Sequence, residues 1–407
     1  MKFLFGVWGL TNGGAERVLA VLCNTLAEKG HEVHLYIRFH EKQEYCISPK
    51  VHVHRAFDLS IEELDEINHK TGASQDLKHK IIKRIKIIKK VPVIGDYIES
   101  LRLFVTGKDK KEMIAKMIDE IKPDLIIPFL LGAQIEFYHA LLSSDYKAPY
   151  VFTVRSYQDK YDKAEQRIQR FLEKKADYIW CQTKDQIEYY DPELRKKAFV
   201  VGNPINELFI SAQIKPVSQI KRFIAAGRLT NQKNYRLMIE GFKEAAGNDE
   251  SFSLDIYGNG ELKEDLEKLI HDIGAEKQIR IHRRTDDILS KYQEADAFLM
   301  TSDFEGMPNA LMEAMCLGLP CISTDCPTGP RDLIGDNERG YLVPCRNRKK
   351  LVKTIQELTR ECGDAAERAG KAAEYIRSNF NRDVICDAFI RECERICRKG
   401  ISSEKDL

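Results

Sequence analysis

The stretch that decides the fold is Asp303–Gly318, which reads DFEGMPNALMEAMCLG. An apolar run ends at Ser302, an acidic loop with a Gly-Met-Pro turn follows, and the small and apolar residues after it predict a helix. Glu305 lies in the loop, and Glu313 lies eight residues later in the helix. Open α/β sheets bind ligands at the carboxyl ends of their strands, and exposed helix amides there attract phosphate. The pattern therefore indicates a ligand rich in hydroxyls and phosphate, such as a nucleotide-sugar.

Working outward, the chain reads as two successive α/β units. The first opens with a strand at Phe3–Trp8, a helix at Ala15–Glu28 and a strand at Glu32–Arg38. The second opens in the same way, with a strand at Phe223–Gly227 and a helix at Tyr235–Ala246. Strands that alternate with helices predict parallel sheets. We therefore expect an α/β fold of two Rossmann-like domains that face each other across a cleft.

The length supports two domains, because 407 residues exceed what one hydrophobic core ordinarily holds. We expect an N-terminal domain over residues 1–205, with the polar stretch Ile210–Ile220 as the linker. The C-terminal domain is expected over residues 206–375, and residues 376–407 are expected to form a helix that packs back toward the N-terminal domain, followed by a tail.

Composition narrows the class of protein. Hydrophobic residues make up 43% of the chain and charged residues 31%, as in soluble globular proteins. The 64 basic and 63 acidic residues nearly cancel, so we expect no nucleic-acid partner. We find no apolar run of the roughly 18 residues that a membrane span needs, and MKFLFGVWGL fits a first strand better than a signal peptide. The eleven cysteines, an odd number, favour a reducing, cytoplasmic location.

A basic loop in the second unit is the first motif that supports a ligand-binding role for the two carboxylates. It reads GRLTNQKN, and it places Arg228 and Lys233 five positions apart between a strand and a helix. A departing nucleoside diphosphate accumulates negative charge, which two cations stabilise in the transition state. The loop by itself is equally compatible with an ordinary surface loop.

Two glycine turns are further candidates for phosphate contact. Gly13 and Gly14 lie in the first strand-to-helix turn, and Gly258-Asn259-Gly260 follows a strand of the second unit. Glycine lets backbone amides approach a phosphate closely. Because the first turn lacks the GxGxxG pattern, it argues against a dinucleotide-dependent dehydrogenase.

Taken together, the motifs GGAERV, GRLTNQKN, YGNGEL and SDFEGMPNALMEAMCLGLPCISTDCPTGPRDLI resemble those of retaining GT-B-fold glycosyltransferases of family 4. The spacing from Glu305 to Glu313 is the signature of that family. The resemblance implies that Arg228 and Lys233 hold the diphosphate of the sugar donor. It also implies that Glu313 binds the ribose hydroxyls and that Glu305 contacts the transferred sugar.

The resemblance extends to the lining of the sugar-donor pocket. It implies that the Gly13-Gly14 loop closes over the phosphate or the acceptor, and that Ile281–Arg283, with His282, faces the nucleobase. The remaining residues that we expect to bind the sugar donor are Gly258, Asn259, Arg283, Gly306, Met307, Pro308 and Asn309. The resemblance implies no metal and no other cofactor, since Arg228 and Lys233 take the place of a metal.

The chain departs from many relatives at one point. Where those relatives carry a His at the end of a middle strand of the first domain, this chain has Val154-Arg155-Ser156. Arg155 cannot act as a base, because its pKa exceeds about 12. We expect it to stabilise negative charge or contact the sugar donor; the alternative is a surface ion pair. Asp332 likewise replaces a Glu of many relatives.

A basic segment, Lys78–Lys90, reads KHKIIKRIKIIKK. As a helix it would carry an apolar stripe beside a cationic face, which favours contact with an anionic membrane surface. The alternative is a helix that packs on its own domain with solvated lysines. His52 and His54 alternate on a predicted strand and face one side, but the sequence supplies no further ligands for a metal.

These observations predict a cytoplasmic glycosyltransferase, either free or bound at the inner face of the plasma membrane. It would transfer a hexose or N-acetylhexosamine from a UDP-sugar to a glycan or a polyprenyl-diphosphate-linked acceptor, with retention of configuration, in the synthesis of cell-surface polysaccharide. The alternatives are a sucrose- or glycogen-type synthase, a nucleotide-sugar epimerase of GT-B fold, and a non-catalytic subunit that binds nucleotide-sugars.

Overall fold

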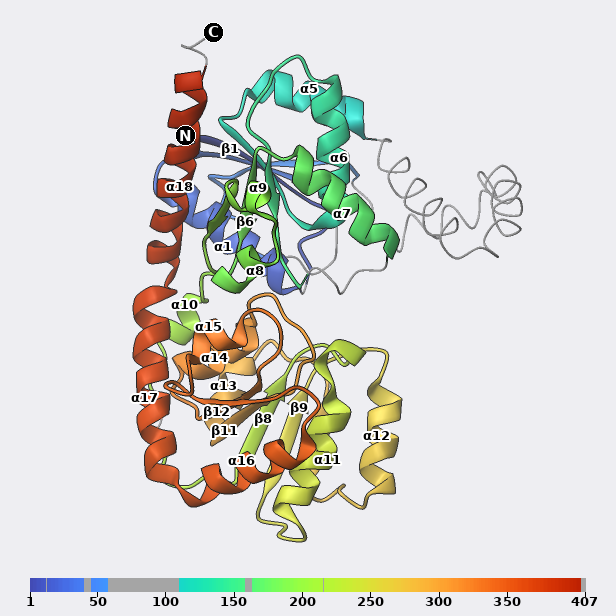
Figure 1. Cartoon of the computed structure of the whole chain (residues 1–407), viewed down its shortest axis with the longest axis vertical. Coiled ribbons are helices and arrows are strands. Elements are labelled where there is room, and N and C mark those ends of the chain that lie inside the picture. Colours follow the sequence, from blue (N-terminus) through green and yellow to red (C-terminus); the bar gives the residue numbers. More distant parts are fainter. Residues whose placement is uncertain (12, 40–44, 58–109, 158–162, 215, 404–407) are drawn as a thin grey trace, which may run out of the picture. The chain divides into compact units, whose positions relative to one another are not determined.

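The structure is a computed structural model that describes residues 1–11, 13–39, 45–57, 110–157, 163–214 and 216–403. It divides into two compact units. Unit 1 holds residues 1–181, 187–201 and 386–407, and unit 2 holds residues 182–186 and 202–385. Each unit contains a parallel β-sheet with helices around it (Figure 1). The two Rossmann-like domains expected from the sequence are therefore present.

Unit 2 is built on a six-stranded parallel sheet with the order β10-β9-β8-β11-β12-β13. The order reverses beside β8, and such a switch point is where doubly wound sheets bind ligands. Its strands are β8 (Arg222–Ala226), β9 (Ser253–Tyr257), β10 (Ile279–His282), β11 (Ala297–Met300), β12 (Cys321–Thr324) and β13 (Tyr341–Val343). Its helices are η2 (Asn231–Lys233), α10 (Glu207–Ile210), α11 (Tyr235–Ala246), α12 (Lys263–Asp272), α13 (Ile288–Glu294), α14 (Asn309–Cys316), α15 (Pro330–Ile334), α16 (Arg348–Arg360) and α17 (Cys362–Asn379).

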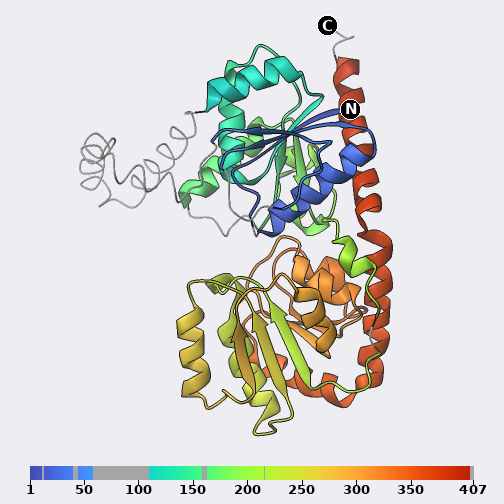
Figure 2. The same cartoon turned by 180° about the vertical axis from the view of Figure 1, so that it is seen from behind.

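Alternate residues of these strands pack into helices on both faces of the sheet. On one face, Phe223, Leu254 and Ile256 share a core with apolar residues of α11, α12 and α16. On the other face, Phe298 contacts Tyr292 of α13, and α14 packs against α17. Figure 2 shows α12 beside the strands of this unit from behind. Burial on both faces explains why the strands read as apolar runs rather than alternating patterns.

Unit 1 has the strand order β3-β2-β1-β4, continued through a single parallel bridge between Ile126 and Tyr150 into β5-β6-β7. Its strands are β1 (Lys2–Val7), β2 (Glu32–Ile37), β3 (His52–Arg55), β4 (Leu125–Pro128), β5 (Val151–Thr153), β6 (Tyr178–Cys181) and β7 (Ala198–Val200). Its helices are α1 (Gly14–Glu28), α5 (Lys111–Ile121), α6 (Leu130–Ser143), α7 (Lys163–Lys175), α9 (Pro192–Arg195) and most of α18 (Arg382–Ser403). The short helix α8 (Lys184–Glu188) straddles the boundary between the units.

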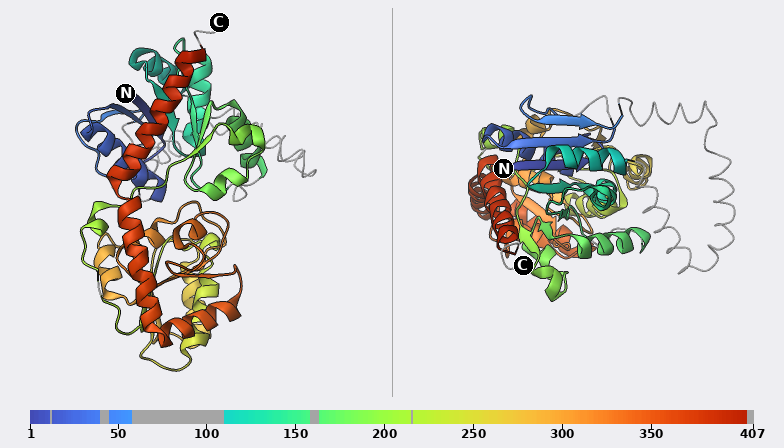
Figure 3. Two further views of the ribbon diagram at one scale, coloured as in Figure 1. Left: turned by 60° about the vertical axis from the view of Figure 1, so that its left-hand side comes forward. Right: turned by 90° about the horizontal axis from the view of Figure 1, so that it is seen from above.

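The last helix, α18, completes the core of unit 1, and Figure 3 shows it beside the N-terminal strand. Phe389 lies with its ring centroid 4.7 Å from that of Trp180 and 5.9 Å from that of Phe3. Lys29 Nζ and Asp387 add an ion pair of 2.9 Å between the end of α1 and this helix. Cys386, Phe389, Cys393 and Ile396 of this helix thus bury their side chains in the unit that begins the chain.

The structure adds details that the sequence patterns missed. The helix α6 begins at Leu130, directly after β4, because Leu130 adopts a left-handed φ of 66° that turns the chain from the strand into the helix. The short elements β13 and α15 were also not predicted. His52 and His54 do lie on one side of β3, where both rings stack on His34. The basic segment Lys78–Lys90 lies outside the described residues.

Candidate functional site

The carboxyl ends of β8, β9 and β10 are tied together into one rigid edge of the unit 2 sheet. The Leu229 amide donates to the Asn259 carbonyl at 2.9 Å, and the Gly258 amide donates to His282 at 3.0 Å. A Cβ at Gly258 would lie only 1.9 Å from the carbonyl oxygen of Gly227, and one at Gly260 only 2.3 Å from that of Leu229. Glycine is therefore required for the two loops to pack backbone to backbone.

Lys233 is presented by a short turn at this edge. It ends η2, and the left-handed Asn234 that follows starts α11 and caps it by accepting from the Leu237 amide. The hydroxyl of Thr301, next to β11, donates to the Lys233 and Asn234 carbonyls at 3.1 and 3.0 Å. The neighbouring strand therefore fixes the backbone from which the lysine side chain extends.

The Lys233 ammonium reaches the Glu305 carboxylate, with 2.5 Å between Nζ and Oε1. The two side chains are 17% and 8% exposed, so water screens this pair little. Ser302 Oγ donates to the same carboxylate oxygen at 2.6 Å, and Gln232 approaches the other oxygen at 3.5 Å. The Glu305 carboxylate is thus contacted by three side chains from two loops.

Contacts with Thr328, Gly329 and Arg346 fix the loop that carries Glu305. Thr328 Oγ donates to the Glu305 carbonyl, and the left-handed Gly329 packs so closely on Gly306 that a Cβ would come within 2.3 Å of its carbonyl oxygen. Asp303, at the start of the loop, accepts from Asn234 at 3.1 Å and from the guanidinium of Arg346 at 2.9 Å. Backbone and side-chain contacts thus define the position of the Glu305 carboxylate.

Arg228 and Glu313 have different surroundings. The Arg228 side chain is exposed, and within the described residues it makes no hydrogen bond or ion pair. Glu313 is 5% exposed within α14, the helix that starts directly after Gly306, Met307 and Pro308. The structure therefore joins Lys233 with Glu305, leaves Arg228 exposed on the same loop as Lys233, and buries Glu313 in the following helix.

Asn203 holds the start of α14 in place. Its Nδ2 donates to Asn309 Oδ1 at 2.9 Å and to the Met307 carbonyl at 3.4 Å, and its Oδ1 accepts from Gln182 at 2.7 Å. Asp332 also bonds within unit 2, since its Oδ2 accepts from the Lys184 amide at 3.0 Å. The motifs of the sequence predicted neither contact.

The segment expected to face a nucleobase lies at the end of β10. His282 Nε2 and Asp255 Oδ1 are 2.6 Å apart, and the imidazole stacks on Tyr257 with 4.6 Å between ring centroids. Arg283 is exposed, and Asn259 Oδ1 accepts from the neighbouring Arg284 amide at 3.3 Å. His282, Arg283, Gly258 and Asn259 thus share one end of the sheet with Lys233.

The candidate residues of unit 1 lie at the carboxyl end of its own sheet. Gly13 precedes α1, and a Cβ there would lie 1.9 Å from Glu16 Oε2, while Gly14 is the first residue of that helix. Arg155 follows β5, with its guanidinium 4.1 Å from the ring centre of Phe129 and 4.0 Å from that of Trp180. Its half-buried position between two rings differs from the surface ion pair considered above, and desolvation lowers the pKa of Arg155.

Sequence reasoning passed over Ser302, Gln232 and Thr328, although all three lie within the motifs it used. Each supports Glu305 through a polar contact that only the fold creates. A usable signal was the polar pair Thr301-Ser302 at the end of an otherwise apolar strand. Among the described residues, no group of three His, Cys, Asp or Glu side chains could hold a metal ion. No helix in the described part of the chain is long and apolar enough to cross a membrane.

Comparison with known proteins gives matches to one family. Residues 208–375 match the family described as Glycosyl transferases group 1. The chain is 31% identical over 245 residues to an uncharacterized glycosyltransferase of Methanocaldococcus jannaschii, an alignment that covers 54% of this chain and 60% of that protein. It is 25% identical over 366 residues, 88% of both chains, to a Campylobacter jejuni α-1,4-N-acetyl-D-galactosaminyltransferase named for GalNAc-α-(1→4)-GalNAc-α-(1→3)-diNAcBac-PP-undecaprenol.

The fold also matches solved structures. TarM of S. aureus, crystallised in complex with UDP among other ligands, aligns with a TM-score of 0.71 and 15% identity over 97% of this chain and 100% of that one. At this low identity the likeness shows the fold alone. The two Rossmann-like units of this chain are those of GT-B proteins.

Proposed function

We propose that this chain, of which residues 208–375 match the glycosyl transferases group 1, is a retaining glycosyltransferase of family 4 that uses a UDP-sugar. The sugar transferred would be a hexose or N-acetylhexosamine. Galactose, GalNAc or GlcNAc is favoured because the loop Asp325–Asp332 resembles that of relatives that use such donors. The acceptor would be a glycan or a polyprenyl-diphosphate-linked oligosaccharide in the synthesis of cell-surface polysaccharide.

One observation carries the proposal: Lys233 and Glu305 meet at the carboxyl edge of the unit 2 sheet, 2.5 Å apart and mostly buried. Removing an ion pair from water costs free energy. A fold is often equally stable, or more stable, with hydrophobic residues of similar volume at the same positions. A pair kept at the ligand-binding edge of a doubly wound sheet is better explained by ligand chemistry. The exposed Arg228 on the same loop adds a second cation for the diphosphate.

In the proposed reaction, the bond between the anomeric carbon and the β-phosphate oxygen of UDP breaks first. Lys233 and Arg228 stabilise the negative charge that builds up on the leaving diphosphate, which is the task of a metal ion in other transferases. Because Glu305 holds the ammonium in place, Lys233 needs little reorganisation when the charge develops. No step requires a bound metal or another cofactor.

The acceptor hydroxyl then attacks the anomeric carbon from the face that UDP leaves, so the configuration is retained. The diphosphate oxygen takes the proton of that hydroxyl. Glu305 contacts the sugar, and its ionised carboxylate stabilises positive charge on the ring. Glu313 binds the ribose hydroxyls, and its buried position in α14 fits a fixed contact rather than a moving one.

Relatives support the nature of both substrates. The TarM structure contains UDP, and the Campylobacter enzyme is named for a PP-undecaprenol saccharide. A lipid-linked acceptor is consistent with a cytoplasmic enzyme at the inner face of the plasma membrane. The segment Lys78–Lys90 would supply the contact with anionic lipid.

A screen of UDP release tests the function. The purified chain is incubated with each of several nucleotide-sugars, with lipid extract as acceptor, and the products are separated. A glycosyltransferase yields UDP and a glycoside of retained configuration in equal amounts. An altered nucleotide-sugar without UDP would identify an epimerase, and binding without any product would identify a non-catalytic subunit.

A further inference from the structure

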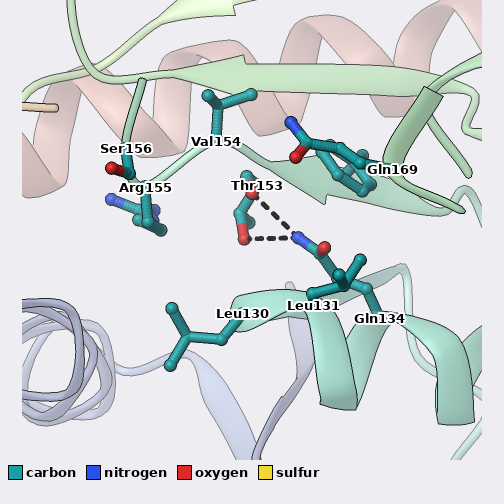
Figure 4. A pocket seen from close by; sticks show the side chains of 9 residues that line it. Leu130, Leu131, Gln134, Thr153, Val154, Arg155, Ser156 and Gln169 are labelled. Carbon is teal, nitrogen blue, oxygen red and sulfur yellow. Dashed lines mark hydrogen bonds between the residues drawn. The ribbon is translucent and has the colours of Figure 1, made fainter. Parts of the chain in front are cut away.

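The pocket beside Arg155 in unit 1 is too small for a sugar. It lies beyond the carboxyl end of β5, and Gln134, Arg155 and Gln169 are among the residues that line it (Figure 4). The space admits about one water molecule. The buried polar side chains that bear on the proposed reaction lie in unit 2, where they hold the residues that follow Glu305.

Asn203 is the centre of a buried hydrogen-bond network in unit 2. It comes directly after Gly202, where the chain passes from unit 1 into unit 2, and it is 2% exposed. Its Nδ2 donates to Asn309 Oδ1 at 2.9 Å, and its backbone N–H donates to Met307 Sδ at 3.1 Å. Asn203 thus holds both neighbours of Pro308, which lie 104 and 106 positions later in the chain.

The residue before Asn203 also packs on Met307. A Cβ at Gly202 would lie 3.2 Å from Met307 Cε, 3.3 Å from its Sδ and 2.9 Å from Cε1 of Phe380. Any side chain at this position would therefore push against Met307 and Phe380. Glycine lets the Met307 side chain rest on the backbone of this segment.

Gln182 sets the direction of the Asn203 amide. Its Nε2 donates to Asn203 Oδ1 at 2.7 Å, so that Nδ2 of Asn203 points toward Asn309. The Gln182 backbone N–H donates in turn to Gln186 Oε1 at 2.6 Å. Within the described residues, Gln182 Oε1 is buried without a hydrogen-bond partner. The donor Nε2 is therefore the part of this side chain that the network uses.

The residues that Asn203 holds connect two parts of the proposed sugar-donor site. Met307 comes two residues after Glu305, and Asn309 is the first residue of α14, which also carries Glu313. A helix moves as one body, so a shift at its first residue also shifts the side chains of the next turn. The placement of Glu313 relative to Glu305 therefore depends on the contacts with Asn203.

The start of α14 has no side-chain cap of its own. Pro308 occupies the N-cap position, where Ser, Thr, Asp or Asn would usually accept a hydrogen bond from the helix. Upstream, Thr328 Oγ donates to the Glu305 carbonyl. The loop is thus anchored at Glu305 by Thr328 and at Asn309 by Asn203.

We propose that Asn203 is a positioning residue for the sugar-donor site. It sets the place of Met307 and Asn309, and with them the start of α14, so that Glu305 and Glu313 keep the spacing that a UDP-sugar requires. Asn203 acts through these residues rather than on the reacting atoms. The inference rests on the proposed function for the identity of the ligand.

Calorimetric titration with UDP tests the proposal. Gln182→Met should leave the unfolding free energy near that of the parent, because it removes an unpaired buried oxygen together with the donor to Asn203. UDP binding should still weaken about threefold, since the Asn203 amide loses its fixed direction. Asn203→Ala removes the side-chain contacts and should weaken UDP binding at least about tenfold at a temperature where the variant is fully folded.

Asn206→Ala is the matched control in the same segment. Asn206 caps α10 by accepting from the Leu208 amide at 3.0 Å, so its loss should lower stability and leave UDP affinity unchanged. Parent affinity in both Gln182→Met and Asn203→Ala would overturn the proposal. If Asn203→Ala does not fold, Gln182→Met decides: weaker binding at parent stability supports the role, and unchanged binding refutes it.

Hydrogen exchange separates this inference from the proposed function. Without any ligand, amides of α14 should exchange about tenfold faster in Asn203→Ala or Gln182→Met than in the parent, while amides of α12 keep the parent rate. Faster exchange in α14, with a parent that neither binds UDP nor transfers sugar, would sink the proposed function and leave Asn203 as the residue that positions α14. Transfer by the parent, with variants that bind UDP equally well, would do the reverse.

Discussion

The charged side chains at the carboxyl edges of the two sheets are contacted by different groups. In unit 2, the Lys233 ammonium and the Glu305 carboxylate neutralise each other at 2.5 Å, with Ser302 as a further donor. In unit 1, the Arg155 guanidinium lies between two aromatic rings, 4.1 Å from the ring centre of Phe129 and 4.0 Å from that of Trp180. The paired edge suits a ligand whose charge changes during a reaction. At the other edge, aromatic faces hold the cation.

The substitution Lys233→Ala tests the role of the ion pair in unit 2 and should have the largest effect. We expect turnover at saturating sugar donor to fall by about two to three orders of magnitude, because the leaving diphosphate loses its fixed cation. Unfolding free energy should also drop by about 3–5 kcal/mol, since Glu305 stays buried without its partner. Lys263→Ala, which removes an exposed pair with Glu267, is the control for both measurements. Full turnover in Lys233→Ala would refute the assigned role.

Gly258→Ala tests whether the unit 2 edge depends on backbone contact. The added Cβ would lie 1.9 Å from the Gly227 carbonyl oxygen, so the two loops must separate. We expect a loss of about 1–3 kcal/mol in stability and weaker UDP binding in calorimetry. Gly370→Ala, in α17 with nothing within 4 Å of the new Cβ, should stabilise the chain slightly. If both variants bind UDP as tightly as the parent does, close contact between the loops of Gly227 and Gly258 is not required for UDP binding.

A third test uses pH and concerns unit 1. Burial raises the pKa of Glu173 to about 7, while hydrogen bonds from Gln169 and Tyr190 oppose the rise. The folded state therefore holds a proton that the unfolded state releases near the ordinary glutamate pKa of 4.5. Stability from this group is full below about pH 4.5 and is lost as pH rises to about 7.

Glu173→Gln should remove this part of the pH dependence, which amounts to at most about 3 kcal/mol. Urea denaturation at pH 5 and pH 7.5 measures the difference in the parent and in the variant. Glu193→Gln, at an 80% exposed carboxylate, is the control and should follow the parent. A variant with the same pH dependence as the parent would show that Glu173 does not titrate in this range.

The smallest effect is expected from Arg346→Gln. Arg346 pairs with Asp303 at 2.9 Å, close to the Lys233 pair, but its side chain is 77% exposed. Salt and water screen such a pair, so turnover should stay within about twofold of the parent. A loss comparable to that of Lys233→Ala would mean that Arg346, rather than burial of the neighbouring pair, dominates this edge.

Much of unit 2 could be predicted, because its elements are long apolar runs separated by glycine loops. The helix Tyr235–Ala246 has the bounds that the sequence indicated. The short elements β13 and α15 were missed, since three to five residues carry too little periodicity to be recognised. In unit 1, the start of α6 was missed because no capping residue precedes Leu130, which only the tertiary structure holds at a φ of 66°.

The roles of Arg228, Lys233, Glu305 and Glu313 were suggested by motif spacing, and they stay predictions until the experiments above are done. Spacing gave no sign that Lys233 and Glu305 would meet, because 72 residues separate them and their contact depends on β8 and β11 being neighbours. The support from Thr328, 23 residues after Glu305, was hidden for the same reason. Contacts between distant loops depend on strand order, which local pattern does not encode.

The sequence by itself determined the α/β class and the two units, because hydrophobic periodicity and glycine-rich loop motifs are local properties of the chain. Only the tertiary structure decided which side chains meet. It paired Lys233 with Glu305, placed Arg155 between Phe129 and Trp180, and left Gln169 Oε1 facing a pocket. The physical reason is that burial and hydrogen-bond satisfaction depend on neighbours brought together by packing, which residue order alone does not specify.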